Sequence, residues 1–443
     1  MNSYEKTITG LKAQGIHSIL TQFCDLHGVA KGKLVPLDNL REWVESGAGF
    51  AGPSIWGTGL ARHGARSEYY GRVQLPSLRP LPFMPGVAHA VCDGFAGGQP
   101  LETCSRQVLK RQVQQLKARG WTLWVGIEPE FFLLRKDAAG QWVGADAQDQ
   151  LDKPSYDLKA IHRNRAFLDE MRDTLMQLGF ELQQIDHEDA CGQYEINYKF
   201  DDALAAADRF MLFKLSAHAV AEKHGAVFSC MPKPFANAPG SGLHFHLSIT
   251  DAQGQAVLTD LSDPLQLSAT GYQFIAGLLL HADALTALCA PTVNSYKRLA
   301  VSHSASGTTW APVWKTFGAN NRTCLVRTVA GRFELRVPDP SCNIYAALAA
   351  TLAAGMDGID RALTAPEPCA EDLYERFSSG QAMPARLPAD LGQAVTALAN
   401  DQVLTDAVGA PFCEQFIELK RLEWGAYCQQ VSDWELQHYA NAF

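Results

Sequence analysis

The chain has 443 residues, of which 47% are hydrophobic and 19% are charged, so it can bury a large core in two or three domains. Its formal net charge of −9, with no run of Lys and Arg, argues against a nucleic-acid partner. No apolar run reaches the roughly 18 residues that a membrane helix needs, and the first residues lack the layout of a signal peptide. The 11 cysteines include no Cys-x-x-Cys pair, so we expect reduced thiols, a cytoplasmic protein and no membrane partner.

The N-terminal part predicts a small α+β sheet domain, because short alternating runs such as residues 16–23 are separated by loops rich in Gly and Pro. The Gly- and Pro-rich segment 93–106 follows it and marks a domain boundary. Residues 105–119 have the spacing of an amphipathic helix, which Ser105 is expected to cap and Gly120 to end. The alternating strands and helices that follow fit an α+β catalytic domain, so the expected domains are 1–99 and 100–443.

Paired acidic residues stand out in two strand-like segments. In GIEPEFFLL, Glu128 and Glu130 are two apart and would project from the same side of a strand. Two buried carboxylates repel each other unless cations stand between them, although a solvated edge strand is the alternative interpretation. In DHEDACGQYEIN, a hairpin turn at Gly192 would bring Glu188 and Glu195 together, while acids that are simply solvated beside a turn are the alternative.

Two further segments add imidazole and guanidinium groups. In PGSGLHFHLSI, His244 and His246 share one face after a Gly-rich turn, and metal ligation and core packing both remain open. In AGRFELRVPDP, Arg332, Glu334 and Arg336 share one face, with a paired surface ladder as the alternative. A carboxylate-rich set favours Mg²⁺ or Mn²⁺ over zinc, and together with arginines it points to phosphoryl transfer. The sequence contains neither a Walker-type phosphate loop nor a kinase signature, so a nucleotide site must be of another kind.

Seven blocks of this chain, in the same order, resemble the glutamine synthetase family over nearly its full length. They read GIEPEFFLL, DHEDACGQYEIN, MPKPF, GSGLHFHLS, NSYKRL, NNRTCLVR and GRFELRVPDP. The resemblance implies an N-terminal β-grasp domain and a catalytic domain of antiparallel strands plus helices. It also implies ATP and Mg²⁺ or Mn²⁺ as cofactors, glutamate and a small amine as substrates, and a homo-oligomer of stacked rings, a dodecamer. A neighbour's N-terminal domain would complete each active site.

The resemblance further implies a role for each matching residue. The implied roles are Glu130, Glu188 and Glu195 at a first metal; Glu128, His244 and Glu334 at a second; His246, Ser248 and Arg332 on ATP, with Phe200 near the adenine; Gly240, Arg298 and Arg336 on glutamate; and Arg322 and Arg327 on the phosphate in transfer. In the implied reaction, ATP phosphorylates the γ-carboxylate of glutamate and an amine then attacks the acyl phosphate. Metals and arginines would neutralise the charge on the transferring group.

The chain departs from the family where ammonium binds. The family's acid in the N-terminal domain is Ala51 here, within FAGPSI, although Ser54 remains, and the flap glutamate is Ser304. A small cation needs charged or polar partners to leave water, so losing both carboxylates favours a larger, more apolar amine, with Trp56 and Trp310 as candidate walls. Core packing is the alternative for Trp310. Pro239 and Val329 also replace family residues near glutamate and ATP.

In these features the chain resembles the branch of the family that contains γ-glutamylmethylamide synthetases and type III glutamate–ammonia ligases. We therefore expect a γ-glutamyl–amine ligase with methylamine as acceptor; glutamine synthesis is the alternative, followed by isopropylamine or an aromatic amine such as aniline. Deprotonation of the amine would fall to His303 or Glu188. A non-catalytic family member is a further alternative, but such a protein should have lost metal ligands. A metal-dependent hydrolase is another, but it would leave the arginines unexplained. Tyr374 lies roughly where some relatives are adenylylated, but a packing role fits its flanking sequence better.

Overall fold

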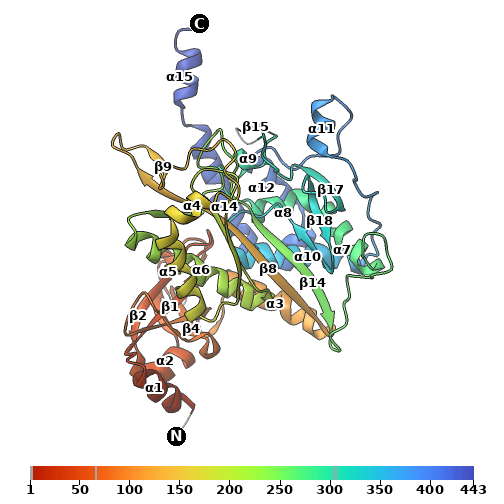
Figure 1. Cartoon of the computed structure of the whole chain (residues 1–443). Coiled ribbons are helices and arrows are strands. Elements are labelled where there is room, and N and C mark those ends of the chain that lie inside the picture. The colour runs from red at the N-terminus through yellow and green to blue at the C-terminus, as the bar shows by residue number, and fades with distance from the viewer. Residues whose placement is uncertain (1–2, 65–66, 302, 305–306) are drawn as a thin grey trace.

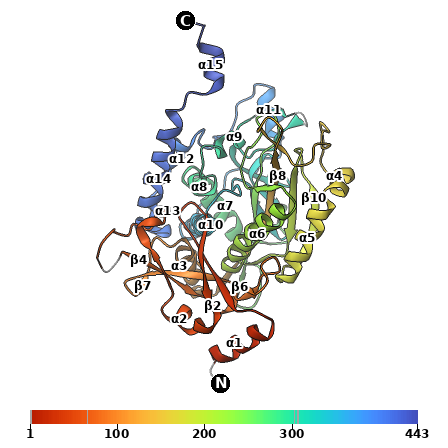
Figure 2. The same cartoon turned by 90° about the vertical axis from the view of Figure 1, so that its left-hand side faces the viewer.

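The computed structural model describes residues 3–64, 67–301, 303–304 and 307–443. Two sheets organise the chain: a smaller N-terminal one at the base of the view in Figure 1 and a larger one above it. The two ends of the chain lie at opposite ends of the molecule in both cartoon views (Figures 1 and 2). This arrangement confirms the predicted α+β class.

The N-terminal sheet has the strand order β2-β1-β6-β4-β3, in which β1 and β6 run parallel and the other neighbours antiparallel. Helices α1 (Ser3–Ala13) and α2 (Leu40–Glu45) accompany it, and its core is separate from that of the larger sheet. The boundary between residues 99 and 100 stays a prediction. The strands are β1 (Ser18–Cys24), β2 (Ala30–Pro36), β3 (Ala48–Ala51), β4 (Glu68–Val73), β5 (Arg79–Pro80), β6 (Val87–Ala96) and β7 (Gln99–Pro100).

Helix α3 (Ser105–Ala118) follows the N-terminal sheet, as the sequence predicts. The expected cap is wrong, because Cys104 is the N-cap residue and the Ser105 hydroxyl is buried inside the first turn without a hydrogen-bond partner. Gly120, with φ of +76°, ends the helix as predicted, since glycine adopts this backbone without strain. Arg106 on α3 bonds Asp208 of α6 (Ala203–Lys223) through Nε and Nη2, both at 2.8 Å, and also pairs with Asp93, so a buried ion cluster joins β6 of the N-terminal sheet to these two helices.

The larger sheet has the order β10-β11-β8-β14-β19-β18-β17, antiparallel except for the β17–β18 pair. Its centre is the 16-residue strand β8 (Trp121–Lys136), which also pairs with the short strands β9 (Trp142–Gly144), β12 (Asp201–Asp202) and β13 (Val227–Ser229). The other strands are β10 (Leu182–His187), β11 (Gln193–Tyr198), β14 (Leu243–Asp251), β17 (Trp314–Ala319), β18 (Cys324–Val329) and β19 (Arg332–Leu335). A separate pair, β15 (His303–Ser304) and β16 (Gly307–Thr308), forms a short hairpin.

Helices surround this sheet, and α10 packs against α3, α7, α8 and α13 in the main core. The helices are α4 (Leu158–Arg163), α5 (Arg165–Gln177), α6 (Ala203–Lys223), α7 (Ala269–Leu280), α8 (Ala282–Cys289), α9 (Ser295–Arg298), α10 (Ile344–Asp360), α11 (Leu373–Ser378), α12 (Leu391–Asn400), α13 (Gln402–Val408), α14 (Ala410–Cys428) and α15 (Asp433–Tyr439). Among the described residues no single helix is long and apolar enough to cross a membrane. Helices α7 and α8, which form a bent pair, together reach the length and apolar composition of a span, and nothing beyond length and composition supports one.

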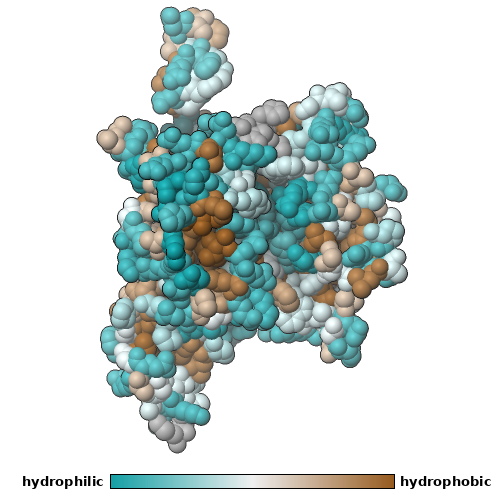
Figure 3. Space-filling view, in the orientation of Figure 1, coloured by the Kyte–Doolittle hydropathy of each residue, from teal (hydrophilic) through white to brown (hydrophobic). Residues whose placement is uncertain are grey.

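Helix α15 stands clear of the rest of the molecule at the top of the space-filling view (Figure 3). It carries Trp434, Leu436 and Tyr439, each of which is at least half exposed.

The 11 cysteines, all within the described part of the chain, are free thiols as expected.

Candidate active site

Side chains alternate strictly along the central strands, so the candidate site residues lie on one face of the sheet and the hydrophobic core on the other. On β8 the residues Leu123, Val125 and Ile127 are buried in the hydrophobic core, so the residues between them, up to Glu128, project from the opposite side of the sheet. On β14 and β19 the core-facing residues are likewise apolar, with Phe245 and Leu335 completely buried. One face of the sheet is therefore packed and the other is polar.

The strand register brings the predicted residues of this polar face together. His244 is the cross-strand partner of Glu128, and His246 that of Glu334. The hairpin predicted around Gly192 is present, and β11 places Glu195 directly opposite Glu130 on β8. Residues that are far apart in the sequence thus reach one site because the strands carrying them are neighbours in the sheet.

A first triad of carboxylates consists of Glu130, Glu188 and Glu195, each of which offers an oxygen within 4.8 Å of the others. Burial, followed by the charge of neighbouring carboxylates, raises the pKa of Glu188 and of Glu195 well above the usual range. Asp186, the cross-strand partner of Glu195 on β10, has a pKa raised to about 6 by burial and by Glu128 and Glu130. A set of crowded oxygen donors of this kind fits a hard divalent cation such as Mg²⁺ or Mn²⁺.

A second triad consists of Glu128, His246 and Glu334, within the same 4.8 Å limit. The resemblance places His244 here instead, and its Nδ1 lies 3.3 Å from Glu128 Oε2 and 3.4 Å from Glu334 Oε1. Both histidines therefore face the same carboxylates, and which one would hold a metal stays a prediction. The donor set, two carboxylates and an imidazole, again fits Mg²⁺ or Mn²⁺.

Basic side chains around the second triad offset the cost of burying its acids. Burial alone would raise the pKa of Glu128, but hydrogen bonds from His244 and His246 outweigh it and hold that pKa below the usual range. Burial opposes ionisation of Glu334 as well, yet the charge of Arg336, followed by the two histidines, lowers its pKa to about 2. Both acids are therefore ionised at neutral pH.

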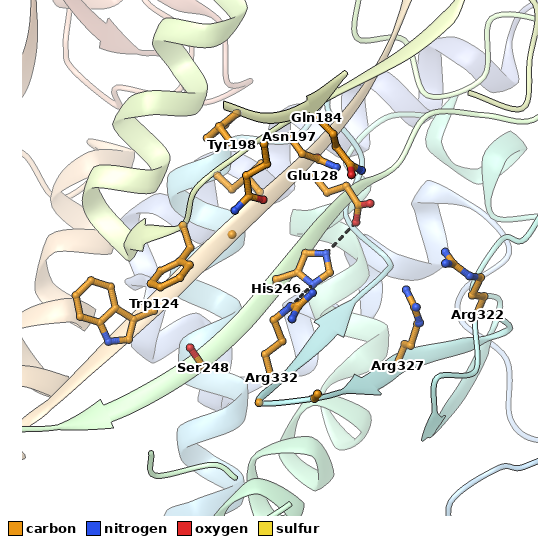
Figure 4. Close-up of a pocket in the computed structure, with 16 residues that line it drawn as sticks. Trp124, Glu128, Gln184, Asn197, Tyr198, His246, Ser248, Arg322, Arg327 and Arg332 are labelled. Carbon is orange, nitrogen blue, oxygen red and sulfur yellow. Dashed lines mark hydrogen bonds and ion pairs between the residues drawn. The ribbon is translucent and has the colours of Figure 1, made fainter. Parts of the chain in front are cut away.

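A first cavity, of about 590 Å³, lies along β8, β11 and β14 (Figure 4) and holds the residues expected to contact ATP, including Phe200, Ser248 and Arg332. Arg332 Nε donates to His246 Nδ1 at 3.1 Å, and His246 Nε2 bonds Glu128 Oε2 at 2.8 Å, so a chain of contacts crosses the cavity. Arg322 and Arg327 lie together on the side away from Trp124 in this view. Lining residues that the sequence analysis missed include Trp124, Gln183, Gln184, Asn197 and Tyr198.

A second cavity, of about 540 Å³, shares Glu128 and Arg322 with the first and contains the residues expected to hold glutamate. There Arg298 donates through Nη1 to Val337 O and through Nη2 to Arg336 O, each at 3.0 Å. The expected glutamate contacts Gly240, Arg298 and Arg336 all line this cavity. Lining residues that the sequence analysis missed include Lys153, Ser155, Tyr156, Asp189 and Gln193.

Several predicted residues lie elsewhere. Ala51 and Ser54 are exposed on the N-terminal sheet, and neither they nor Trp56 are among the described residues that line either cavity. The side chains of Ser304 and His303 lie outside the described part of the structure. Trp310 is 41% exposed and lines the second cavity, so core packing is the wrong alternative for it. Tyr374 is buried and its hydroxyl donates to Ala311 O at 2.9 Å, as a packing residue would.

Comparison with known proteins places this site in a family. Residues 102–439 match the family model described as "Glutamine synthetase, catalytic domain". The chain is 46% identical over 438 residues to the glutamate--methylamine ligase of Methyloversatilis universalis, covering 98% of each. It is 38% identical over 424 residues to a glutamine synthetase of Rhizobium leguminosarum bv. phaseoli, covering 95% of this chain and 96% of that one.

Solved structures agree in fold over the same extent. The chain resembles a complex of GmaS with ADP with a TM-score of 0.92 and 38% identity, covering 98% of this chain and 99% of that one. It resembles GmaS without ligand with a TM-score of 0.90 and 37% identity, with the same coverage. Because both the catalytic-domain match and the nearly full-length similarity point the same way, the chain belongs to the glutamine synthetase family of C–N bond-forming ligases.

Proposed function

We propose that this chain is an ATP-dependent ligase that joins methylamine to the γ-carboxylate of glutamate, forming γ-glutamylmethylamide, ADP and phosphate. The observation that carries the proposal is the continuity of the site: the first triad lines the cavity with glutamate-type residues, and Glu128 of the second triad lines both that cavity and the one with ATP-type residues. The 46% identity to a glutamate--methylamine ligase supports the choice of amine.

The reaction proceeds in two balanced steps. An oxygen of the glutamate γ-carboxylate bonds the γ-phosphorus of ATP as the bond to the β,γ-bridging oxygen breaks, and ADP leaves with that electron pair. The amine nitrogen then bonds the acyl carbon, and phosphate leaves with the electrons of the broken C–O bond. Methylammonium gives up one proton before attack, and the nitrogen loses a second as the amide forms.

The residues of this chain act by holding charge in place. Arg322 and Arg327 are in position to neutralise the phosphoryl oxygens, because both line the first cavity and Arg322 also lines the second. Arg336, at the second triad, would hold the γ-carboxylate. Mg²⁺ or Mn²⁺ bound at Glu130, Glu188 and Glu195 and at Glu128, Glu334 and a histidine would supply further charge neutralisation.

An oligomer of stacked rings, a dodecamer as the resemblance implies, and a cytoplasmic location are parts of the same proposal. Two observations support the oligomer: Ala51 and Ser54 lie outside both cavities of their own chain, and α15, which stands clear of the body, exposes Trp434, Leu436 and Tyr439. The 11 free thiols support a reducing compartment.

The test is the identification of the product. The purified chain is incubated with ATP, Mg²⁺, glutamate and methylamine, and the mixture is analysed by mass spectrometry alongside ADP release. We expect γ-glutamylmethylamide in a one-to-one ratio with ADP, and loss of both products in Glu334→Gln. Glu181→Gln, an exposed acid paired with Lys199, is the matched control. ADP without amide would indicate a hydrolase, and neither product would indicate a non-catalytic family member.

A further inference from the structure

We propose that a cavity between β6 and α6 is a binding site for inorganic phosphate in its monohydrogen form, held by Arg79 and His89. This cavity, of about 210 Å³, shares no lining residue with the two cavities of the candidate active site. The inference goes beyond the proposed ligase function, because it concerns residues to which the resemblance assigns no role.

The walls of this cavity come from both parts of the chain. On one side, His89 lies on β6, and Arg79 of β5 is its cross-strand partner in the N-terminal sheet. The opposite wall is one face of α6, with Ala205, Asp208, Arg209 and Leu212. The volume lies below the roughly 300 Å³ at which sites for larger organic ligands begin, so it suits a small ion.

Arg79 is a cation without a counterion in this cavity. Three arginines and two aspartates line it. Two of these arginines are committed to the aspartates: Arg106 bonds Asp208 through two nitrogens, each at 2.8 Å, and Arg209 Nη2 lies 2.9 Å from Asp201 Oδ2. Arg79 forms no hydrogen bond or ion pair with any residue that the structure describes. Its guanidinium therefore leaves the lining with one surplus positive charge.

His89 is a buried acceptor without a donor. Its side chain is only 1% exposed, and its Nδ1 has no hydrogen-bond partner among the described residues. Its Nε2 lies 3.1 Å from Gln22 Oε1, which accepts only, so Nε2 carries the ring proton and Nδ1 is the acceptor. Burial, followed by the charge of Arg79, lowers the His89 pKa to about 4, so the ring is neutral at neutral pH. An unpaired buried acceptor is costly, and Nδ1 therefore calls for a donor supplied from the cavity.

Monohydrogen phosphate offers both of the groups that this cavity lacks. Its anionic oxygens accept hydrogen bonds from the Arg79 guanidinium, and its hydroxyl donates to His89 Nδ1. Sulfate has the same shape and charge but no hydroxyl, so it would leave Nδ1 unpaired, and an ionised phosphate monoester would do the same. The acid Asp93, which pairs with Arg106 from outside the lining, is itself balanced by Lys110 at 2.6 Å.

The test measures the binding of anions to the purified chain by isothermal titration calorimetry, at constant ionic strength and without ATP or metal. At about pH 8, where phosphate monoesters are ionised, we expect inorganic phosphate to bind at least about tenfold more tightly than sulfate or methyl phosphate. Arg79→Gln should weaken phosphate binding by at least about tenfold, because a charge-assisted hydrogen bond is lost. Arg41→Gln, at an exposed arginine of α2, is the matched control and should leave phosphate binding unchanged.

Two further variants assign the binding to this cavity. His89→Leu keeps the cation and removes the acceptor, so phosphate and sulfate should bind it with similar affinity. Arg322→Gln identifies any phosphate that binds in the first cavity instead. Thermal unfolding checks that each variant is folded, and the comparison of phosphate with sulfate on the wild-type chain requires no variant.

Three results would overturn the proposal. They are no phosphate binding to the wild-type chain, sulfate binding as tight as that of phosphate, and loss of phosphate binding in Arg322→Gln with none in Arg79→Gln. None of these results bears on the proposed ligase function, which stands or falls on the amide product.

Discussion

Arg327 and Glu334 face each other across β18 and β19, and Arg327 Nη1 donates to Glu334 Oε2 at 2.9 Å. Arg336 bonds the other oxygen of the same carboxylate. The acid that the resemblance gives to a metal therefore also anchors the arginines given to phosphate and to glutamate. Removing or moving Glu334 would disturb metal, phosphate and glutamate binding together.

Asn320 should matter for catalysis although it lines neither cavity. Its Oδ1 accepts a hydrogen bond from Arg327 Nε at 2.9 Å, and its backbone has a φ of +46°, which asparagine tolerates better than most residues. Asn320→Ala should misplace Arg327 and lower kcat by roughly tenfold to a hundredfold with little change in the KM for methylamine. Steady-state kinetics would check this. Asn320→Asp keeps the acceptor and should retain most activity; equal loss in both variants would contradict the account.

Phe200 should contribute to the affinity for ATP. Its ring is 53% exposed in the first cavity and meets Trp124 edge-on, with centroids 5.9 Å apart, so one face is available to a base. Phe200→Ala should raise the KM for ATP by about tenfold, because stacking is lost, and leave kcat at saturating ATP nearly unchanged. Titration of ATP in the coupled assay measures both. Phe200→Tyr, which keeps the ring, should behave like wild type, and an unchanged KM in Phe200→Ala would argue against adenine binding here.

Restoring an acid at position 51 should favour ammonium. Ala51→Asp should raise the ratio of ammonium to methylamine kcat/KM by about tenfold, because the added carboxylate would bind the smaller and more strongly hydrated cation. Ser46→Asp, an exposed position in the same N-terminal region, controls for the added charge. Since Ala51 lines neither cavity of its own chain, the effect should appear only in the oligomer. An oligomeric variant with an unchanged ratio would show that position 51 lies away from the amine.

His281 should make stability depend on pH. Its Nδ1 lies 2.6 Å from Asp401 and its Nε2 3.0 Å from Asp357. Burial alone would lower the His281 pKa, but the hydrogen bonds to the two aspartates outweigh it and raise that pKa. The stabilisation is therefore complete below the unfolded histidine pKa of about 6.5 and is lost as the pH rises through the folded value.

Denaturant unfolding of His281→Asn and wild type checks this prediction. The difference in the free energy of unfolding between wild type and His281→Asn should be large at about pH 6 and small at about pH 9. His63→Asn, at an exposed position, is the control. A difference that stays constant between these pH values would contradict the assignment of charge to His281.

Much of the site follows from strand alternation. Because side chains two apart share a face, Glu128 with Glu130 and His244 with His246 could be grouped from the sequence, and the hairpin joined Glu188 to Glu195. Extending the same alternation from Glu128 by four residues reaches Trp124 on β8, and extending it from Glu195 by two residues reaches Asn197 on β11. These two cavity residues were missed, although the signal for them was present.

The remaining residues depend on contacts that alternation does not encode. Tyr156 and Ser155 come from a loop that packs against β10 and the β10–β11 turn: the Ser155 hydroxyl donates to Asp189 Oδ1 and the Tyr156 N–H donates to His187 O. The predicted cap of α3 was wrong for a different reason. Serine favours the capping position, but here the Ser105 hydroxyl is buried one residue further into the helix. Local preference gave way to the packing of the helix between the two sheets.

The most direct test of the central claim is a competition between acceptors. The wild-type chain would be given glutamate, ATP and Mg²⁺ with ammonium and methylamine titrated in parallel, and kcat/KM determined for each from phosphate release, with isopropylamine and aniline as further acceptors. We expect a kcat/KM for methylamine well above that for ammonium and for the larger amines. A higher value for ammonium would contradict it and would make glutamine synthesis the reaction of this site.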